Sequence, residues 1–256
     1  MCYDDNARPP MPPGADGTAQ GEDIVLTATD GNRFAAYAAR PGNPTGAQIL
    51  IYPDVRGLHQ FYKDLALRFA EVGITALAMD YFGRTAGLTS RDDSFDFWPH
   101  VQQLQLRTVF DDVSAALTYL RTGPSAGQST FTVGFCMGGT MSLYTGTEDF
   151  GLAGVIGFYS GLSRVLDERK GTALQAARYI KCPVLDLFGG PDPGIPPDQV
   201  QALDKALDEA GVEHEIVVYP GAPHSFFDRR ATEYADACAD AWKRVLGFIA
   251  AHTPKK

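Results

Sequence analysis

From Gln48 onward, short apolar runs alternate with longer amphipathic stretches, and this alternation constrains the possible fold most strongly. The runs ILIYP, ITALAMD, STFTVGF, AGVIGFYS, CPVLDLFG and HEIVVYP are rich in Val, Ile and Leu, which favours strands buried on both faces. The stretch YKDLALRFAEVG and the segment from Val101 to Leu120 predict helices, because their apolar residues recur at helical spacing. The polar side of that segment, which we expect to face solvent, carries Arg107, Asp111 and Asp112. Such alternation predicts an α/β fold, with a mainly parallel sheet between helices.

Later apolar stripes and one turn signal complete the predicted order of elements. A helix is predicted to open at Met137, and further helical patches cover about residues 173–179, 198–210 and 234–251. Near the start of the chain, Asp30-Gly31-Asn32 separates two short runs at 24–29 and 34–39. This turn signal predicts a β-hairpin at the edge of the sheet.

The first residues differ in composition from the rest of the chain. Residues 1–20 are rich in Pro, Gly and small polar side chains, which cannot offset the entropy of ordering, so they predict a tail. Residues 21–256 suffice for a single domain, since the chain of 256 residues is 45% hydrophobic. No apolar run approaches a membrane span, and the N-terminal residues lack the pattern of a signal peptide. We therefore expect a cytoplasmic protein.

The net charge and the cysteine content limit the kinds of partner and metal site that we expect for this chain. A net charge of −9 opposes binding to nucleic acid or to an anionic membrane, so an anionic substrate would need a local basic site. The cysteines are scattered without the paired spacing of a metal site: Cys2, Cys136, Cys182 and Cys238. We expect reduced thiols, with Cys182 and Cys238 in structural roles, in a monomer or a small homo-oligomer.

The stretch VGFCMGGT places a cysteine between glycines, where a predicted strand gives way to a predicted helix. In a nucleophile elbow, small flanking residues allow a sharp turn that lifts the central side chain above the sheet. Gly134 and Gly138 would permit that turn around Cys136. The helix opening at Met137 would direct its N–H groups and positive dipole end at the thiol, which favours a thiolate and an oxyanion beside it. A buried structural cysteine at a tight packing turn is the alternative.

Two further residues follow the elbow in the chain order that such enzymes use, which is nucleophile, acid, histidine. Asp192 follows the apolar run at 184–188, and His224 follows the run at 216–219. Both come at carboxyl ends of predicted strands, where open α/β sheets gather their ligands. Each alone is typical of a turn. Together they predict a triad in which His224 is the base for Cys136 and Asp192 orients the imidazole.

With these motifs the chain resembles the dienelactone hydrolase family of α/β-hydrolases, the carboxymethylenebutenolidases. The resemblance rests on GFCMGG at the elbow, FGGPD before the acid and APHSF around the histidine, and it covers about residues 22–251. It implies an α/β-hydrolase fold and a Cys136–His224–Asp192 triad that opens enol lactones or other activated esters through a thioester, as in the degradation of aromatic compounds. Neither a metal nor a cofactor is implied.

The resemblance also implies roles for residues outside the triad. Asp54, in YPDVRG, matches an acidic residue that interacts with the resting cysteine. Arg84, in DYFGR, matches an arginine that binds a substrate carboxylate. The backbone N–H groups of Val55 and Met137 would form the oxyanion hole. The aromatic pair that would line the substrate pocket is Phe95 and Trp98.

The sequence departs from the family pattern at several of these positions. Asp54 is one methylene shorter than the usual glutamate, and Phe95 lacks the hydroxyl of the usual tyrosine. A second substrate-binding arginine is expected four residues after the histidine, where this chain has Asp228. Arg229 comes one place later. The possible ligands of a substrate carboxylate therefore stay open among Arg56, Arg84 and Arg229.

A thiol nucleophile suits activated esters. A thiolate attacks readily but also leaves readily, so the tetrahedral adduct partitions according to which group departs more easily. The enolate of an enol lactone is delocalised and weakly basic, and it departs without strong acid assistance. The expected substrate is a small lactone or ester, and the family resemblance adds a carboxylate to it. Two alternatives are a carboxylesterase or lactonase of broader specificity, and a noncatalytic small-molecule binder on the same scaffold.

Overall fold

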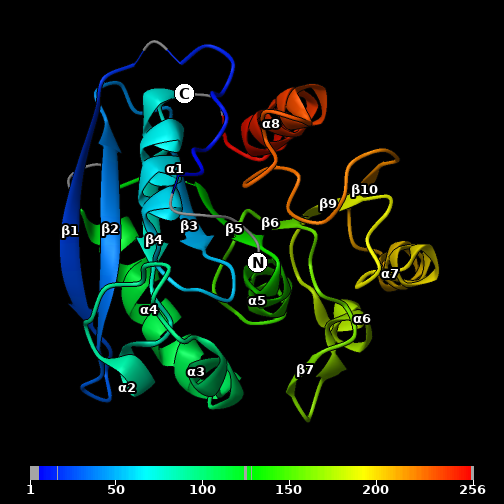
Figure 1. Cartoon of the computed structure of the whole chain (residues 1–256), viewed down its shortest axis with the longest axis horizontal. Helices are drawn as coiled ribbons and strands as arrows, with labels where there is room; N and C mark the ends of the chain where they lie inside the picture. The colour runs from blue at the N-terminus through cyan, green and yellow to red at the C-terminus, as the bar shows by residue number, and fades with distance from the viewer. Residues whose placement is uncertain (1–5, 16, 124–125, 128, 255–256) are drawn as a thin grey trace.

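The computed structural model describes residues 6–15, 17–123, 126–127 and 129–254. A sheet of eight strands forms its centre, in the order β1-β2-β4-β3-β5-β6-β9-β10 (Figure 1). The strands are β1 (Ala19–Thr27), β2 (Arg33–Pro41), β3 (Ala47–Tyr52), β4 (Thr75–Met79), β5 (Ser129–Phe135), β6 (Gly154–Phe158), β9 (Val184–Gly189) and β10 (His214–Tyr219). β2 pairs antiparallel with β1 and with β4, whereas the other neighbours pair in parallel. The predicted mainly parallel sheet and its edge hairpin are confirmed.

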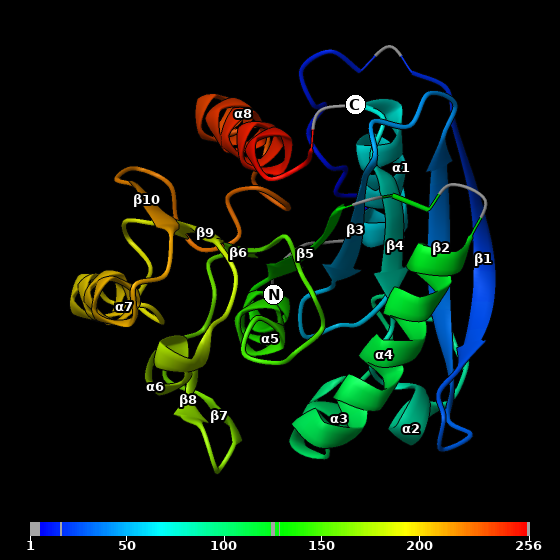
Figure 2. The same ribbon diagram turned by 180° about the vertical axis from the view of Figure 1, so that it is seen from behind.

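Helices cover both faces of this sheet. The longer ones are α1 (Gln60–Glu71), α4 (Leu106–Thr122), α5 (Met137–Thr145), α7 (Pro197–Ala210) and α8 (Ala235–Ala251). The shorter ones are α2 (Gly83–Ala86), α3 (Trp98–Gln102), α6 (Ala173–Ala176) and a 3-10 turn at Ala177–Tyr179. The two views place α1 and α4 on opposite faces (Figures 1 and 2). α1 and α8 lie on the same face, because the rings of Phe69 and Trp242 are 4.9 Å apart.

The core lies along the middle strands and α5. Every residue of β3, β4, β5, β6 and β9 is buried, which explains why these strands appear in the sequence as continuous apolar runs. α5 is buried along its whole length and therefore has no polar face. The residue that precedes it, Cys136, thus begins a helix that is enclosed on all sides.

Two expectations about the segment from Val101 to Leu120 are wrong. The segment is divided between α3 and α4, because α3 ends at Gln102 and the backbone of Gln105 is extended, with φ −117° and ψ 115°. Asp112 does not face solvent: its side chain is buried and accepts hydrogen bonds from Asn32 and Arg84. A buried carboxylate needs such partners, and they lie far away in the sequence.

Residues 6–15 pack against the domain. Pro9 and Pro12 are buried, and the indole N–H of Trp242 donates to the Pro10 carbonyl oxygen at 2.9 Å. The backbone N–H of Gly17 donates to the carbonyl oxygen of Glu71 at 3.1 Å, at the end of α1 and beside the amino end of β4. The Arg8 guanidinium lies 3.7 Å from the Asp64 carboxylate on α1, so the segment runs along the face of the sheet that α1 and α8 cover. Residues 1–5 and 16 of the predicted tail lie outside the described residues.

A small antiparallel ribbon has no counterpart in the sequence-based prediction. It consists of β7 (Val165–Asp167) and β8 (Gly171–Thr172) and follows β6. Both views place α3 and β7 on either side of α5 (Figures 1 and 2). Among the described residues, no helix combines the length and the apolar character needed to cross a bilayer.

Candidate active site

Cys136 occupies a strained turn between β5 and α5. Its backbone has φ 56° and ψ −115°, a conformation that non-glycine residues rarely adopt. The turn is held by a hydrogen bond of 3.0 Å from the backbone N–H of Cys136 to the carbonyl oxygen of Phe158. The thiol is free and partly exposed. This geometry is that of a nucleophile elbow, in which the strain projects the central side chain from the sheet.

Gly134 and Gly138 are required by close backbone contacts. A Cβ atom on Gly134 would lie 1.9 Å from the carbonyl oxygen of Gly138, and one on Gly138 would lie 2.2 Å from that of Pro53. No side chain fits at either position, which confirms the predicted role of both glycines. The second contact also brings the loop after β3, with Asp54 and Val55, against the first turn of α5.

The register of the sheet brings the other predicted site residues to the same edge. The paired positions near the strand ends are Tyr52 with Gly134, Phe135 with Phe158, Phe158 with Leu187, and Gly189 with Tyr219. The parallel strands therefore end at similar levels. Asp54, Cys136, Asp192 and His224 all follow these carboxyl ends, where ligand sites of open α/β sheets form.

Asp192 and His224 are in direct contact. Nδ1 of His224 lies 2.6 Å from Oδ2 of Asp192, although the residues are 32 positions apart. Oδ1 of Asp192 accepts a second hydrogen bond from the backbone N–H of Gly194 at 2.9 Å. The Asp192 side chain is only 3% exposed, whereas the imidazole is 31% exposed. When Nδ1–H of His224 donates to Asp192, Nε2 is the ring nitrogen that can act as a base.

A second carboxylate, that of Asp228, lies close to His224 and Asp54. The Tyr159 hydroxyl donates to Oδ2 of Asp228 at 2.8 Å, and the Tyr159 ring lies 4.8 Å from the His224 ring. Burial raises the pKa of Asp228 well above its ordinary value, and the charge of Asp54 raises it further. Both effects disfavour the charged form of the Asp228 carboxyl, while the hydrogen bond from Tyr159 opposes them.

In the sequence, Asp228 is recognisable only as a departure from the family pattern, and Tyr159 carries no signal of a role in the site. Tyr159 follows β6 with φ 41°, another strained non-glycine conformation at this edge. Its contact with Asp228 joins residues that are 69 positions apart, so no local spacing could have indicated it.

Asp54 is held in a rigid loop. Its side chain is buried, and Oδ1 accepts a hydrogen bond of 2.9 Å from the backbone N–H of Arg56. The Tyr81 hydroxyl donates to the carbonyl oxygen of Pro53 at 2.7 Å and also contacts that of Asp54. The loop that presents the Val55 N–H is therefore fixed on both sides.

The structure places the predicted arginines in different surroundings. Arg84 lies against α4, where its Nη2 is 2.8 Å from Oδ1 of Asp112, while its Nη1 pairs with Asp30. Arg56 is buried and pairs with Asp93. Arg229 is exposed to solvent.

The predicted aromatic pair is divided between two environments. Phe95 is partly buried, stacks on His100 at a centroid distance of 5.1 Å and lies beneath the Arg91 guanidinium. Trp98 lies at the start of α3 with 56% of its surface exposed. An exposed indole of this size is available to an apolar ligand.

The other described cysteines lie in apolar surroundings. Cys182 and Cys238 are buried, and burial raises the pKa of each thiol to about 12. Both therefore stay protonated at neutral pH and are poor nucleophiles. Cys2 lies outside the described residues.

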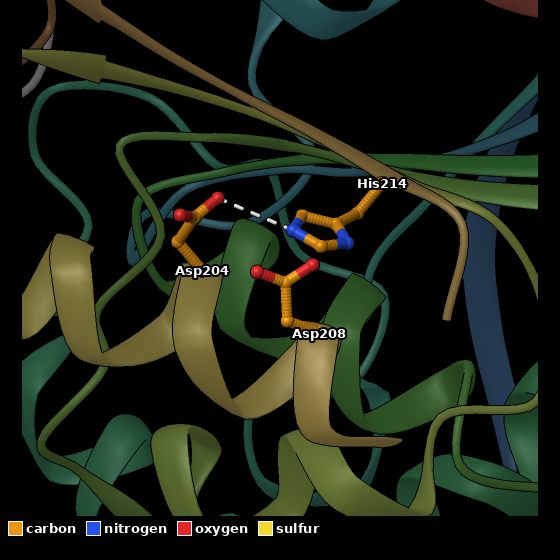
Figure 3. A group of neighbouring side chains, drawn as sticks. All are labelled: Asp204, Asp208 and His214. Carbon is orange, nitrogen blue, oxygen red and sulfur yellow. Dashed lines mark hydrogen bonds and ion pairs between the residues drawn. The ribbon is translucent and has the colours of Figure 1, made fainter. Parts of the chain in front are cut away.

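Among the described residues, three potential metal ligands gather on α7 and β10. Donor atoms of Asp204, Asp208 and His214 lie within 4.8 Å of one another (Figure 3). Nε2 of His214 is 3.2 Å from Oδ1 of Asp204, and its Nδ1 is 2.7 Å from the carbonyl oxygen of Val212. These two contacts account for the position of the imidazole. The group lies at the amino end of β10, away from Cys136.

The chain is similar to known hydrolases in sequence and in fold. The chain matches the dienelactone hydrolase family over residues 34–253. It is 31% identical to a candidate carboxymethylenebutenolidase of Methylorubrum extorquens, over 92% of this chain and 82% of the relative. It is 28% identical to a candidate 2-oxo-3-(5-oxofuran-2-ylidene)propanoate lactonase of a Bradyrhizobium species, over 90% of this chain and 94% of the relative.

A solved structure extends the comparison to the fold. A candidate dienelactone hydrolase from Klebsiella pneumoniae superposes with a TM-score of 0.79 at 26% identity, over 91% of this chain and 99% of that one. The sheet and its flanking helices are those of an α/β-hydrolase. The chain therefore belongs to the dienelactone hydrolase family and is a carboxylic ester hydrolase.

Proposed function

We propose that the chain hydrolyses an enol lactone or a similarly activated ester, with Cys136 as nucleophile, His224 as base and Asp192 as its orienting acid. The hydrogen bond of 2.6 Å between His224 and Asp192 carries this proposal, because it fixes the imidazole at the edge where Cys136 begins α5. The order of the three residues along the chain and the family membership support it.

The first step forms a thioester. Nε2 of His224 takes the thiol proton, and the thiolate of Cys136 attacks the carbonyl carbon of the lactone. A C–S bond forms while negative charge moves to the carbonyl oxygen. The N–H groups of Met137 and Val55 stabilise that charge, and such a donor contributes about 3 kcal/mol to the barrier reduction.

The second step consumes one water molecule. The adduct collapses with cleavage of the ring C–O bond, and the departing enolate takes the proton from His224 and becomes a ketone. Water then attacks the thioester while His224 accepts its proton. The C–S bond breaks, His224 returns the proton to the sulfur, and the carboxylic acid leaves while the Cys136 thiol is restored. The net reaction converts a lactone and water into a keto acid, and the residues of this chain supply each proton transfer.

Lactones are favoured among the possible substrates. The names of the relatives specify lactone chemistry, and the Bradyrhizobium name also contains a propanoate group. The exposed Trp98 offers an aromatic surface for a flat, conjugated ring. We assign Asp54 the role of the acid that modulates the resting thiol, and Phe95 a place in the pocket wall. Cytoplasmic location and assembly as a monomer or small oligomer stay predictions.

Replacement of the nucleophile tests the proposal. Cys136→Ala is expected to reduce the hydrolysis of a dienelactone and of 4-nitrophenyl esters by at least about 1,000-fold, because no other group forms the acyl intermediate. Cys182→Ser is the matched control and should keep its activity. Mass spectrometry of the wild-type protein, quenched during turnover, should detect an acyl group on the peptide that contains Cys136.

Two results would contradict this mechanism. Wild-type rates in Cys136→Ala would assign the nucleophile to another residue. Tight binding of lactones without turnover would support the noncatalytic alternative. A preference for aryl esters over dienelactones would keep the triad and favour an esterase of broader specificity.

A further inference from the structure

Several arginines near the carboxyl edge of the sheet are already paired with carboxylates. Arg84 pairs with Asp112 and Asp30, and Arg56 pairs with Asp93. Arg91 binds the buried Asp80 at 2.9 Å. If a substrate drew Arg84 or Arg91 away, the buried carboxylate of Asp112 or Asp80 would lose its partner, at a cost of several kcal/mol. Arg56 is itself buried, with 3% of its side chain exposed.

Arg164 is held in a different way. Its Nη2 donates to the carbonyl oxygen of Val101 at 3.1 Å, and its Nη1 lies 3.5 Å from the sulfur of Met137. Within the described chain, no carboxylate lies within ion-pair distance of its guanidinium. The side chain is half-buried, so its charge is screened less by water than that of the exposed Arg229.

The contacts of Arg164 place its guanidinium next to the residue that follows the proposed nucleophile. Met137 directly follows Cys136 and presents the backbone N–H that the proposed mechanism assigns to the oxyanion hole. Val101 lies on α3, and Trp98 is three residues earlier on the same helix, where side chains are neighbours. The Arg164 guanidinium therefore bridges α3 and the start of α5.

We infer that Arg164 binds a carboxylate on the acyl part of the substrate while the ester carbonyl meets the N–H of Met137. This inference rests on the proposed function and assigns the carboxylate contact to Arg164, a residue outside the three that the sequence left open. Two guanidinium contacts, to a neutral carbonyl and a thioether, orient the side chain and leave its charge uncompensated. A guanidinium has five N–H donors, so a carboxylate can still be bound in a bidentate manner.

The experiment compares two esters that differ by one charge, 4-nitrophenyl hydrogen succinate and its neutral methyl ester. Arg164→Gln is expected to lower kcat/KM for the anionic ester by about 10- to 100-fold, mainly through KM, the typical loss for a charged hydrogen-bonded pair. The rate for the neutral ester should change by less than about 2-fold. For the anionic ester, the kcat/KM of Arg164→Lys should lie between those of the wild type and Arg164→Gln. Lysine keeps the positive charge but lacks the paired N–H donors of the guanidinium.

Two controls make the comparison specific. Arg178→Gln changes the net charge equally, on the turn that precedes β9 at the opposite edge, and should leave both rates unchanged. Arg84→Gln tests the sequence-based assignment directly. The inference would be overturned if Arg84→Gln selectively lost activity toward the anionic ester while Arg164→Gln kept it.

A structural role for Arg164 would give a different result. If Arg164 only clamps α3 to the segment after β6, both esters should lose activity equally and the inference fails. Calorimetric binding of succinate to Cys136→Ala, with and without Arg164→Gln, tests the inference without turnover. Weaker binding with Arg164→Gln supports it even if neither ester is hydrolysed by the wild type, and equal binding contradicts it.

Discussion

At the scale of single residues, Asp186 shows how burial changes chemistry away from the reacting groups. This aspartate lies in β9, fully enclosed, and accepts hydrogen bonds from the Ser160 hydroxyl at 3.0 Å and from the backbone N–H of Leu187 at 3.1 Å. Burial raises its pKa from 3.8 to about 8. The folded protein therefore keeps a proton on Asp186 that the unfolded chain releases.

This difference in proton binding predicts the effect of pH on stability. Between about pH 4 and pH 8 the unfolded chain loses the Asp186 proton and the folded protein keeps it, so the free energy of unfolding falls as pH rises, by about 1.4 kcal/mol per pH unit. Asp186→Asn should remove this slope. Urea titrations at a series of pH values, with the exposed Asp96→Asn as control, measure the difference between the variants. Parallel curves for wild type and Asp186→Asn would contradict the assigned pKa.

Residue-scale contacts also explain which site residues could be predicted. Cys136, Asp192 and His224 carry motif signals, because tight turns at strand ends restrict the residues around them. The partners of Arg84 and Asp112 carry no such signal, since their ion pair joins residues 28 positions apart on separate elements. A sequence shows a charge at a given position, but it does not show which opposite charge the fold places beside it.

At the scale of elements, the contact between α5 and the end of β3 decides whether the elbow can form. A side chain on Gly138 would strike the backbone oxygens of Tyr52 and Pro53, at 2.3 and 2.2 Å, and backbone cannot move aside as a flexible side chain can. The loop that carries Asp54 depends on this close approach.

Gly138→Ala tests this dependence. We expect a loss of roughly 3 kcal/mol in the free energy of unfolding, because overpacking of a rigid contact costs about 1–3 kcal/mol or more. Ester hydrolysis should fall at least about 10-fold, as a displaced loop misplaces an oxyanion donor. Gly247→Ala on α8 is the control, because a Cβ there meets nothing within 4 Å. It should be neutral or stabilising, and similar melting temperatures for the two variants would refute the argument.

The strands could be predicted where their burial produces a simple pattern of apolar residues in the sequence. The middle strands are enclosed on both faces and give continuous apolar runs. The break between α3 and α4 was not predictable, because the apolar spacing continues through residues 103–105. The ribbon of β7 and β8 is too short and too exposed to give a period.

At the scale of the whole molecule, the N-terminal segment joins elements that are remote in sequence. Arg8 pairs with Asp64 on α1, Pro10 accepts a hydrogen bond from Trp242 on α8, and Gly17 then binds Glu71 at the end of α1. Composition predicted a tail here, yet the buried Pro9 and Pro12 restrict the unfolded chain and thereby reduce the entropy lost on ordering.

Deletion of residues 1–12 should therefore lower stability. We expect a loss of about 1–3 kcal/mol in the free energy of unfolding, because the Trp242 N–H loses its acceptor and apolar surface is exposed. In a Trp98→Phe background the emission of Trp242 should shift to longer wavelength. The value of kcat/KM for a neutral ester, measured on the same variant, tests whether the segment also contributes to catalysis, and an unchanged free energy of unfolding would contradict the expected loss of stability. A large loss of activity would place the segment near the active site.

The enclosure of α5 has a consequence for how new specificities can arise. Every residue of α5, the helix that follows Cys136, is buried, so substitutions in it disturb the core. By contrast, α3 and the segment after β6 are short and partly exposed to solvent. Mutant libraries restricted to residues 95–101 and 161–167 should yield altered substrate ranges at a high frequency of folded clones. Libraries in α5 should yield mostly insoluble protein.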